Sequence, residues 1–420
     1  MPESAPDEAT TLPHSARVVI VGAGQAGLSV AYHLQRRGLT PGSDLVIVDR
    51  GPTTGGAWQF RWESLRLGTA HRVSDLPGLH DLGLSFETAD QTRAARDVVA
   101  EYYELYEQHF GLQVFRPVDV TAVRERMPGG DLLVSATRGS TGTGTRTGTG
   151  TGIEIISAEV VVNASGTWAT PFRPFYKGGE TFRGLQISTP EYRSAHDFAG
   201  KRVIVVGGGT SAVGFLLELE GVAASTFWVT RRPVEFGEPG AQARASTFAD
   251  GAGSGSSSVL AVPPADAQAA VGLESRLAAV AQQDEAAKAG RVLPSIISGT
   301  GLPATPKNLA GVERGLLVAH PMFTSIEHGG VRFADGSFEP ADAIIWATGF
   351  RADLAHLAPL KLREQAGGIR VEQGRAGRNG RVFLAGYGPQ ASTIGANRAG
   401  RLVAVQVLDA LQQIEHPEPV

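Results

Sequence analysis

Three glycines and one aspartate have the spacing that binding of a dinucleotide requires. The glycines stand in the run Gly22-Ala-Gly24-Gln25-Ala-Gly27, and Asp49 follows Gly27 by twenty-two residues. The first glycine permits a tight turn, the second lets backbone N–H groups approach a pyrophosphate, and the third lets a helix pack closely. The carboxylate of the aspartate can accept hydrogen bonds from a ribose hydroxyl. This pattern predicts a nucleotide site with the pyrophosphate at a helix N-terminus.

The elements that must position these residues are present on both sides of the glycines. Residues 18–21 are all β-branched, as in a parallel strand buried on both faces, and they lead directly into Gly22. Apolar residues then recur with helical spacing as far as Gly38, and a second apolar run, residues 45–48, ends at Asp49. Strand, turn, helix and acid together favour nucleotide binding over an ordinary tight turn between a strand and a helix.

The same pattern occurs a second time. After Lys201 the chain repeats a buried strand, then Gly207-Gly-Gly209-Thr210-Ser211-Ala212, then a helix. Each unit ends in a similar run: Gly166 closes the first, 144 residues after Gly22, and Gly349 closes the second, 142 residues after Gly207. Each closing run follows an expected hairpin, the second with a turn at residues 334–337. The sequence therefore predicts two dinucleotide-binding units, the second inserted within the first.

The two units differ at the end of their second strand. The first unit has Asp49 there, whereas the second has Arg231 and Arg232. Arginine suits a ribose 2′-phosphate through forked, charge-assisted hydrogen bonds, so the second unit is expected to prefer NADPH. The alternative is that the two arginines end a surface strand and bind nothing. The first unit then takes the other dinucleotide, for which FAD is the natural candidate.

Composition limits the chemistry that the chain can perform. There is no cysteine, which excludes a redox disulfide, a cysteine nucleophile, an iron–sulfur cluster and thiolate metal ligands. Electron transfer must therefore belong to bound cofactors, and no metal site is predicted. A net charge of −4 argues against nucleic acid as a partner, and no apolar run is long enough for a membrane span. Residues 1–13 are expected to be a disordered tail of a cytoplasmic protein.

Two stretches of low complexity interrupt the chain. Residues 139–152 lie between two strand-like runs, 132–137 and 153–156, and are expected to be the long tip of a hairpin. Residues 237–258 precede a helical run at 274–290. They predict a mobile loop followed by a helix, with a lid over substrate as one option.

From residue 17 to the C-terminal helix, the chain resembles the flavin-containing monooxygenases, in particular a short bacterial branch associated with cation efflux or arsenic operons. The resemblance rests on the first glycine motif, on Gly55-Gly56-Ala-Trp58 with residues 61–67, and on residues 163–168, 207–212, 347–350 and 384–388. It implies that NADPH reduces FAD, that oxygen adds at the flavin C4a position, and that the resulting hydroperoxide oxygenates a small molecule. Two positions depart from the family pattern. A linking motif has Ser188 where the family has histidine, although its last residue, Tyr192, matches the branch that oxidises heteroatoms; and Tyr387 follows Gly386 where many flavoproteins have aspartate.

The candidate site residues combine both lines of reasoning. The expected flavin site comprises Gly22, Gly24, Gln25, Gly27, Asp49, Gly56, Trp58, Arg66, Gly166 and Gly386. The expected NADPH site comprises Thr167, Gly207, Gly209, Thr210, Ser211, Arg231 and Arg232. The candidate catalytic residues are Ser188, Tyr192, His71 and Asn397, although His71 is as readily explained as a structural histidine.

These observations predict an α/β protein with two Rossmann-like, three-layer domains. The FAD domain is expected at 14–177 and 350–420, and the inserted NADPH domain at 178–349. The expected activity is oxygenation of nitrogen or sulfur in a small substrate with molecular oxygen, and a homodimer is one option. One alternative is a reductase or oxidase that passes electrons to oxygen, a quinone or a metal without inserting an atom; Ser188 favours it. Another is a non-catalytic nucleotide sensor.

Overall fold

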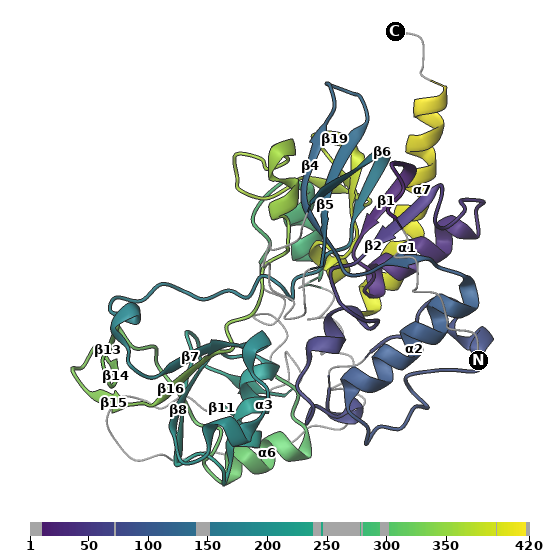
Figure 1. Cartoon of the computed structure of the whole chain (residues 1–420). Coiled ribbons are helices and arrows are strands. Elements are labelled where there is room, and N and C mark those ends of the chain that lie inside the picture. The colour runs from purple at the N-terminus through teal and green to yellow at the C-terminus, as the bar shows by residue number, and fades with distance from the viewer. Residues whose placement is uncertain are drawn as a thin grey trace. The chain divides into compact units, whose positions relative to one another are not determined.

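The computed structural model describes residues 11–70, 73–139, 152–237, 245–246, 278, 280–294, 302–391 and 393–416 (Figure 1). The chain divides into two compact units. The first contains residues 1–169, 284–293 and 352–420, and the second contains residues 170–283 and 294–351. Within the described ranges, no helix combines the length and apolar character that crossing a membrane requires.

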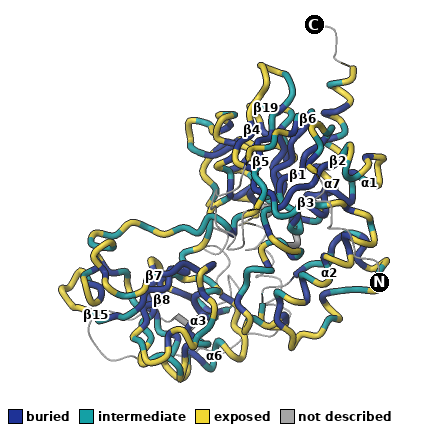
Figure 2. The backbone as a smooth tube through the Cα atoms, viewed as in Figure 1, coloured by how far each residue is buried: buried dark blue, intermediate teal, exposed yellow. Residues whose placement is uncertain are grey.

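The first unit is built on a nine-stranded sheet. Its central strands are β1 (Ser15–Val21), β2 (Leu45–Val48) and β6 (Ile153–Asn163), and β19 (Asn379–Leu384) and β3 (Val114–Phe115) extend it on either side. All these neighbours pair in parallel. The run at 18–21 pairs on both sides and is buried, as its unbroken β-branched sequence predicts (Figure 2). The short strands β17 (Val371–Glu372) and β18 (Arg375–Ala376) complete one edge.

Two antiparallel strands branch from this sheet at β6. Strand β5 (Leu132–Arg138) pairs with the first half of β6 and with β4 (Val118–Glu125). The antiparallel pairing of β5 and β6 confirms the predicted hairpin, and most of the predicted tip, residues 140–151, lies outside the described residues.

Helices of the first unit share one apolar core with the sheet. Helix α1 (Gln25–Gln35) follows the glycine turn and contacts α7 (Thr393–Glu415), while α2 (Ala95–Phe110) buries its tyrosines Tyr103 and Tyr106 in the same core. Both tyrosines are fully buried, so they serve to pack this core. The predicted helical run near 274–290 is helical at residues 280–288, and residues 284–293 belong to the first unit.

The second unit has a five-stranded parallel sheet in the order β12, β9, β8, β16, β7. These strands are Ala319–His320, Ser225–Val229, Arg202–Val206, Ala343–Trp346 and Leu185–Ser188. Helices α3 (Thr210–Leu219) and α6 (Pro306–Glu313) accompany it. The predicted hairpin before the second closing run is present as β14 (Gly330–Arg332) and β15 (Phe338–Pro340), which form a separate three-stranded sheet with β13 (Ser325–Glu327).

The structure confirms the internal repeat in atomic detail. In each unit the first glycine donates its N–H to the end of the second strand: Gly22 to Val48 O at 2.7 Å, and Gly207 to Val229 O at 2.9 Å. In each unit the alanine of the closing run donates to the last residue of the first strand, both at 2.8 Å: Ala164 to Val21 and Ala347 to Val206. Parallel pairing and these bonds place the glycine turn of each unit at the carboxyl end of its sheet, where such folds bind ligands.

Candidate functional site

The turn from Gly22 to Gly27 excludes side chains at two positions and leaves a third open. Gly22 has a φ of +107°, and a Cβ there would lie 2.5 Å from the carbonyl oxygen of Ala164. A Cβ on Gly27 would lie 1.9 Å from the carbonyl oxygen of Gly22. A Cβ on Gly24 would meet only the Cα of Gly56, at 4.0 Å. The second glycine therefore leaves space through which a phosphate group can reach the backbone.

The helix that follows this turn offers donors to an anion. Helix α1 has Gly24 at its N-cap, and no side chain in the described part of the chain caps it. Helix α3 of the second unit has Gly209 in the same place and is likewise uncapped, whereas Thr305 caps α6 by accepting a hydrogen bond from the Asn308 N–H at 3.2 Å. The first N–H groups of a helix need acceptors, so two uncapped glycine turns suit two pyrophosphates.

Asp49 fixes the conformation of the first turn. Its two carboxylate oxygens accept hydrogen bonds from the N–H groups of Ala23 and Gly51, each at 2.7 Å. The carboxylate is buried at the end of β2. Because a carboxylate can accept about four hydrogen bonds, Asp49 keeps capacity for a ribose hydroxyl.

A second glycine segment lies against the first turn and leads to a buried arginine. A Cβ on Gly56, which has a φ of +52°, would lie 2.7 Å from the Cα of Gly24. The 3₁₀ turn Gly56–Phe60 then buries Trp58, and the guanidinium carbon of Arg61 lies 5.4 Å from the centroid of the Trp58 ring and 4.0 Å from that of Trp168. The tryptophans thus bring the segment after Gly56 together with the segment after Gly166.

Arg61 is a site residue that the sequence analysis missed. Burial lowers its pKa to about 10, and among the described residues its Nε has no hydrogen-bond partner. No carboxylate in the described part of the chain pairs with it. In the sequence, Arg61 is part of the family motif made of residues 55–58 and 61–67. That motif does not show that the charge of Arg61 would be buried.

Gln25 and Asn397 meet beside the first turn. Their side-chain atoms Nε2 and Oδ1 are 3.5 Å apart; Gln25 also donates to the Ser74 carbonyl at 2.9 Å, and Asn397 donates to the Asp75 carbonyl. Gly386 also lies here, because a Cβ on it would be 3.4 Å from the Cβ of Ala26.

Four other predicted residues have different outcomes. Gly166 is exposed with a φ of +68°, and Thr167 follows it in the first unit. Arg66 is exposed at the N-cap of a short 3₁₀ turn (Leu67–Thr69), and no ion pair between described residues includes its guanidinium. His71 lies outside the described residues.

A buried polar group supports the closing run of the first unit. The Nε2 atom of His356 lies 2.8 Å from Oδ1 of Asn163, which also accepts a hydrogen bond from Ser165 at 2.9 Å. Ser165 donates in addition to the Asp353 carbonyl at 2.6 Å, and the Asp353 carboxylate pairs with Arg50. These bonds hold the backbone that precedes Gly166, so the group orients the site without facing it.

In the second unit, the structure brings the predicted NADPH residues other than Thr167 to the carboxyl end of one sheet, whereas Thr167 belongs to the first unit. Gly207 has a φ of +132°, a Cβ on it would lie 2.2 Å from the Ala347 carbonyl oxygen, and Thr210 and Ser211 begin α3. Arg231 and Arg232 follow the neighbouring strand β9 and are exposed. The buried Thr230 fixes this bend by donating its hydroxyl hydrogen to the Arg232 carbonyl at 2.8 Å. Two exposed guanidinium groups therefore follow the strand next to the uncapped helix.

The contacts of Ser188 and Tyr192 explain both residues as structural. Ser188 ends β7, and its N–H donates to the Glu191 carboxylate at 2.7 Å, which closes a short 3₁₀ turn. Tyr192 is buried between Phe198 and Phe215, with ring centroids 5.7 and 4.2 Å away, and its hydroxyl lies 3.1 Å from the Glu218 carboxylate. Burial raises the pKa of Tyr192 well above its usual range. These contacts give no support to a catalytic role for either residue.

Two units with paired glycine turns define a class: oxidoreductases that carry one dinucleotide site in each of two α/β units. The family model of pyridine nucleotide-disulphide oxidoreductases matches residues 19–241. A flavin monooxygenase from Stenotrophomonas maltophilia, in a double-mutant form, is 30% identical, with 94% of this chain and 99% of that chain covered and a TM-score of 0.68. The chain therefore belongs to the flavin monooxygenase family within the pyridine nucleotide-disulphide oxidoreductases, and the predicted resemblance is confirmed.

Curated relatives carry related names. Indole-3-pyruvate monooxygenase YUCCA1 of Oryza sativa is 28% identical over 88% of this chain and 86% of its own length. Senecionine N-oxygenase of Tyria jacobaeae is 27% identical over 50% of this chain and 46% of its own length. Bacillithiol disulfide reductase from Bacillus cereus, 18% identical with a TM-score of 0.62 over 94% of this chain and 99% of that chain, shares the fold. The absence of cysteine from this sequence excludes disulfide chemistry on its own thiols.

Proposed function

We propose that this protein is an NADPH- and FAD-dependent monooxygenase that inserts one oxygen atom at nitrogen or sulfur of a small molecule. The observation that carries the proposal is the difference between two otherwise matching turns. One has an aspartate at the end of its second strand and the other has two exposed arginines, Arg231 and Arg232. One protein with two different dinucleotide sites is built to pass a hydride from one dinucleotide to the other.

The residues of the first unit fit FAD. The open face at Gly24 and the uncapped start of α1 suit its pyrophosphate, and Asp49 suits its ribose. The buried Nε of Arg61 needs an anionic or polar partner, which bound FAD provides. When bound, FAD supplies the ring system that accepts a hydride and activates oxygen. Trp58 and Trp168 enclose Arg61 with apolar surface, which keeps water from the guanidinium and strengthens its interactions.

The residues of the second unit fit NADPH. The uncapped start of α3 suits the pyrophosphate, and the guanidinium groups of Arg231 and Arg232 suit the 2′-phosphate that distinguishes NADPH from NADH. Both groups are exposed, and none of the ion pairs found in the described residues occupies them.

The nitrogen or sulfur target rests on similarity. The segment at residues 182–192 ends in tyrosine, as in the heteroatom-oxidising branch that the sequence resembles, and one relative is named an N-oxygenase. Because Tyr192 is buried, we infer that this tyrosine contributes to packing, although its presence is typical of the heteroatom-oxidising branch.

A second candidate function is reduction of oxygen, a quinone or a metal by NADPH without insertion of an atom. Ser188 favours it, because the family motif has histidine there. The N–H of Ser188 donates a hydrogen bond to the Glu191 carboxylate. Because serine replaces histidine, no imidazole is present at this place to help retain the oxidised nicotinamide.

Rapid mixing separates the two functions. The purified protein is reduced with NADPH without oxygen and then mixed with oxygenated buffer, with no substrate present. A long-lived absorbance spectrum that differs from both oxidised and reduced flavin is the expected result. Direct return to oxidised flavin, with one hydrogen peroxide formed per NADPH, would replace the monooxygenase by the reductase or oxidase. Protein that contains no flavin would contradict both.

A further inference from the structure

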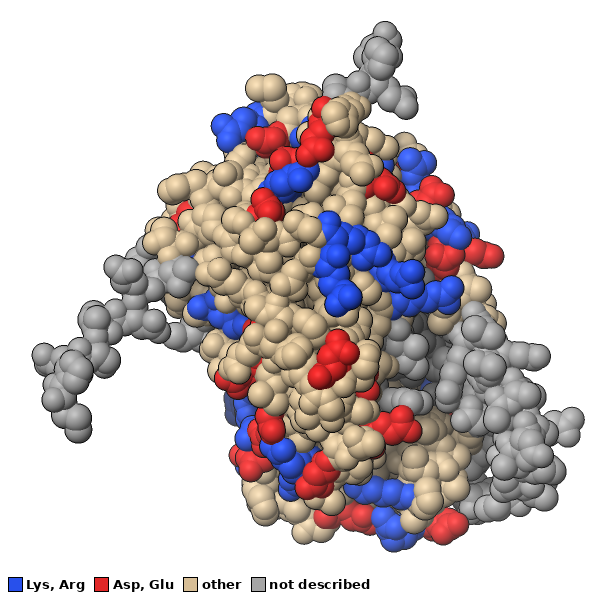
Figure 3. Space-filling model, turned by 90° about the vertical axis from the view of Figure 1, so that its right-hand side faces the viewer, with Lys and Arg blue, Asp and Glu red and all other residues tan. Residues whose placement is uncertain are grey.

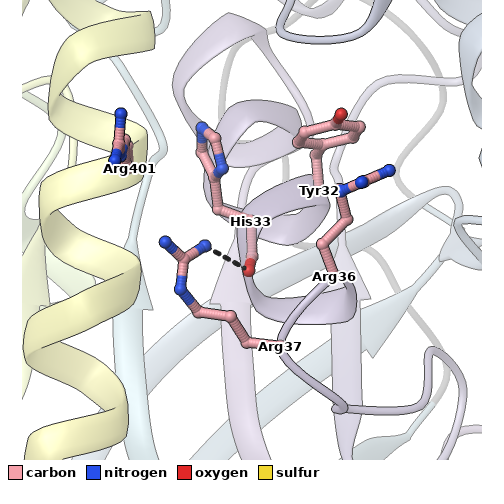
Figure 4. Close-up of a pocket in the computed structure, with 5 residues that line it drawn as sticks. All are labelled: Tyr32, His33, Arg36, Arg37 and Arg401. Atoms are coloured by element: carbon pink, nitrogen blue, oxygen red, sulfur yellow. Dashed lines mark hydrogen bonds between the residues drawn. The ribbon is translucent and has the colours of Figure 1, made fainter.

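A hollow on the first unit is lined only by aromatic and basic side chains. It is open to solvent and has a volume of about 470 Å³, and Figure 4 shows its lining of Tyr32, His33, Arg36, Arg37 and Arg401. Four of these residues lie at the C-terminal end of α1, and Arg401 reaches the hollow from α7. None of them belongs to the predicted cofactor sites. The hollow is therefore a separate feature of the helix pair.

The arginines of the hollow have no acidic partners in the described part of the chain. Arg37 donates from Nη1 to the His33 carbonyl at 3.0 Å, and the guanidinium carbon of Arg36 lies 5.6 Å from the centroid of the Tyr32 ring. By contrast, Arg17, elsewhere on this unit, pairs with both Glu159 and Glu415. The charges of the hollow are therefore uncompensated.

His33 reports the electrostatic potential at this place. Burial lowers its pKa most, and then Arg37, Arg401 and Arg36 lower it further, to about 4 from the ordinary value of 6.5. No acidic group is among the charges that act on it. The imidazole is therefore neutral at neutral pH and can donate one hydrogen bond without adding charge.

A surface view agrees with this electrostatic picture. Figure 3 views the molecule from the side on which α1 and α7 lie in Figure 1, and it shows one large group of basic side chains besides smaller ones elsewhere on this face. Like charges held together by the fold repel one another, and a bound anion relieves that repulsion.

We propose that this hollow binds a small phosphate-type anion with at least two negative charges. Guanidinium groups from two helices offer forked donors to the anion oxygens, and the neutral His33 ring offers a further donor. The volume of about 470 Å³ is many times that of a water molecule and accommodates a pyrophosphate group. An anion held by Arg37 and Arg401 links α1 to α7, and Gln25 and Asn397 connect the same two helices near the first glycine turn.

The test measures the His33 pKa by proton NMR, with its imidazole signal assigned from the His33→Gln variant. The probe is sodium pyrophosphate added to the protein as purified with saturating NADP⁺, so that the cofactor turns are not the sites titrated. Sodium chloride at equal ionic strength is the reference. A bound anion raises the His33 pKa, and we expect a saturable rise of about one unit. The same pKa in both salts would overturn the proposal.

A variant pair gives a second, independent measurement. In the Arg37→Gln/Arg401→Gln variant, calorimetry is expected to show pyrophosphate binding at least ~10-fold weaker, since each guanidinium removed takes away charge-assisted hydrogen bonds. The matched control is Arg363→Gln, because Arg363 is also exposed and also donates from Nη1 to a nearby carbonyl, that of Gly367 at 2.7 Å. The control is expected to bind like the original protein. Equal affinity in the double variant and the control would overturn the proposal, and binding abolished equally in both would do the same.

Discussion

Arg61 shows how one residue can reveal a ligand. A buried cation that lacks an acidic partner is costly, because it loses water and gains no opposite charge. The faces of Trp58 and Trp168 offset part of that cost through cation–π contact, but they accept no strong hydrogen bond from Nε. The arrangement is favourable only when another group meets these donors, and bound FAD is the group that the proposed function supplies.

Replacing Arg61 tests this reasoning. For Arg61→Gln we expect FAD to bind about 10- to 100-fold more weakly, since hydrogen bonds to a charged group contribute about 1.5–3 kcal/mol. The free energy of unfolding of the flavin-free protein should change by less than about 1 kcal/mol, because removal of a buried charge compensates for the missing cation–π attraction. Fluorescence titration with FAD and urea unfolding measure the two quantities. Arg96→Gln, which removes a partly exposed arginine paired with Glu63 and Asp97, is the control and should bind FAD normally.

For Tyr192 we expect a substitution to change stability and leave activity unchanged. Tyr192→Phe keeps the ring between Phe198 and Phe215 and removes only the hydroxyl beside Glu218. We expect the free energy of unfolding to decrease by about 0.5–1.5 kcal/mol, with kcat unchanged. Thermal unfolding and steady-state NADPH oxidation check this. If the turnover rate instead fell by about two orders of magnitude in a protein of nearly normal stability, the catalytic role that the sequence pattern suggested would be restored.

At the scale of elements, we expect two glycines of the first turn to have different roles: Gly27 is required for folding, and Gly24 is required for FAD binding. Gly27→Ala places a Cβ 1.9 Å from a carbonyl oxygen, so we expect it to destabilise the fold by at least ~2 kcal/mol. Gly24→Ala meets no protein atom closer than 4.0 Å, so the flavin-free protein should keep its stability to within about 0.5 kcal/mol. FAD should nevertheless bind at least ~10-fold more weakly to Gly24→Ala, because the added methyl group occupies the approach of the pyrophosphate. If Gly24→Ala bound FAD normally, this turn would not be the pyrophosphate site.

Elements with a strong local pattern could be predicted from the sequence. The β-branched runs, the glycine turns, both hairpins and the repeat are confirmed because each rests on steric rules that act over a few residues. The inclusion of residues 284–293 in the first unit could not be read from the sequence, because it depends on contacts between segments far apart in the chain.

The candidate site was predictable only in part, for a related reason. Gly22, Gly27 and Gly207 are required by backbone geometry, which a motif records directly. The burial of Arg61 results from Trp168, which lies more than a hundred residues away in the sequence, so no local pattern contains it. Tyr192 matched a family motif and Ser188 departed from it, but the motif does not show whether a residue packs or reacts.

At the scale of the whole molecule, the internal repeat gives two units with the same turn and different residues around it. Asp49 is buried and bonded to the first turn, whereas Arg231 and Arg232 are exposed beside the second. An acid next to a ribose repels a 2′-phosphate, and arginines attract it, so the same fold can hold two dinucleotides without exchanging them. We therefore expect that substitutions can weaken FAD binding and NADPH binding independently of each other.

Variants in the two units should therefore have complementary effects. In Arg231→Gln/Arg232→Gln we expect the ratio of kcat/KM for NADPH to that for NADH to fall about 10- to 100-fold, because charge-assisted bonds to phosphate contribute about 1.5–3 kcal/mol. FAD content and the flavin spectrum should stay normal, since these residues belong to the other unit. Gly24→Ala should show the reverse: low FAD content but, once saturated with added FAD, an unchanged preference for NADPH. If the arginine variant kept its preference, the two arginines would only end a surface strand, and the choice of nicotinamide cofactor would depend on other residues of the second unit.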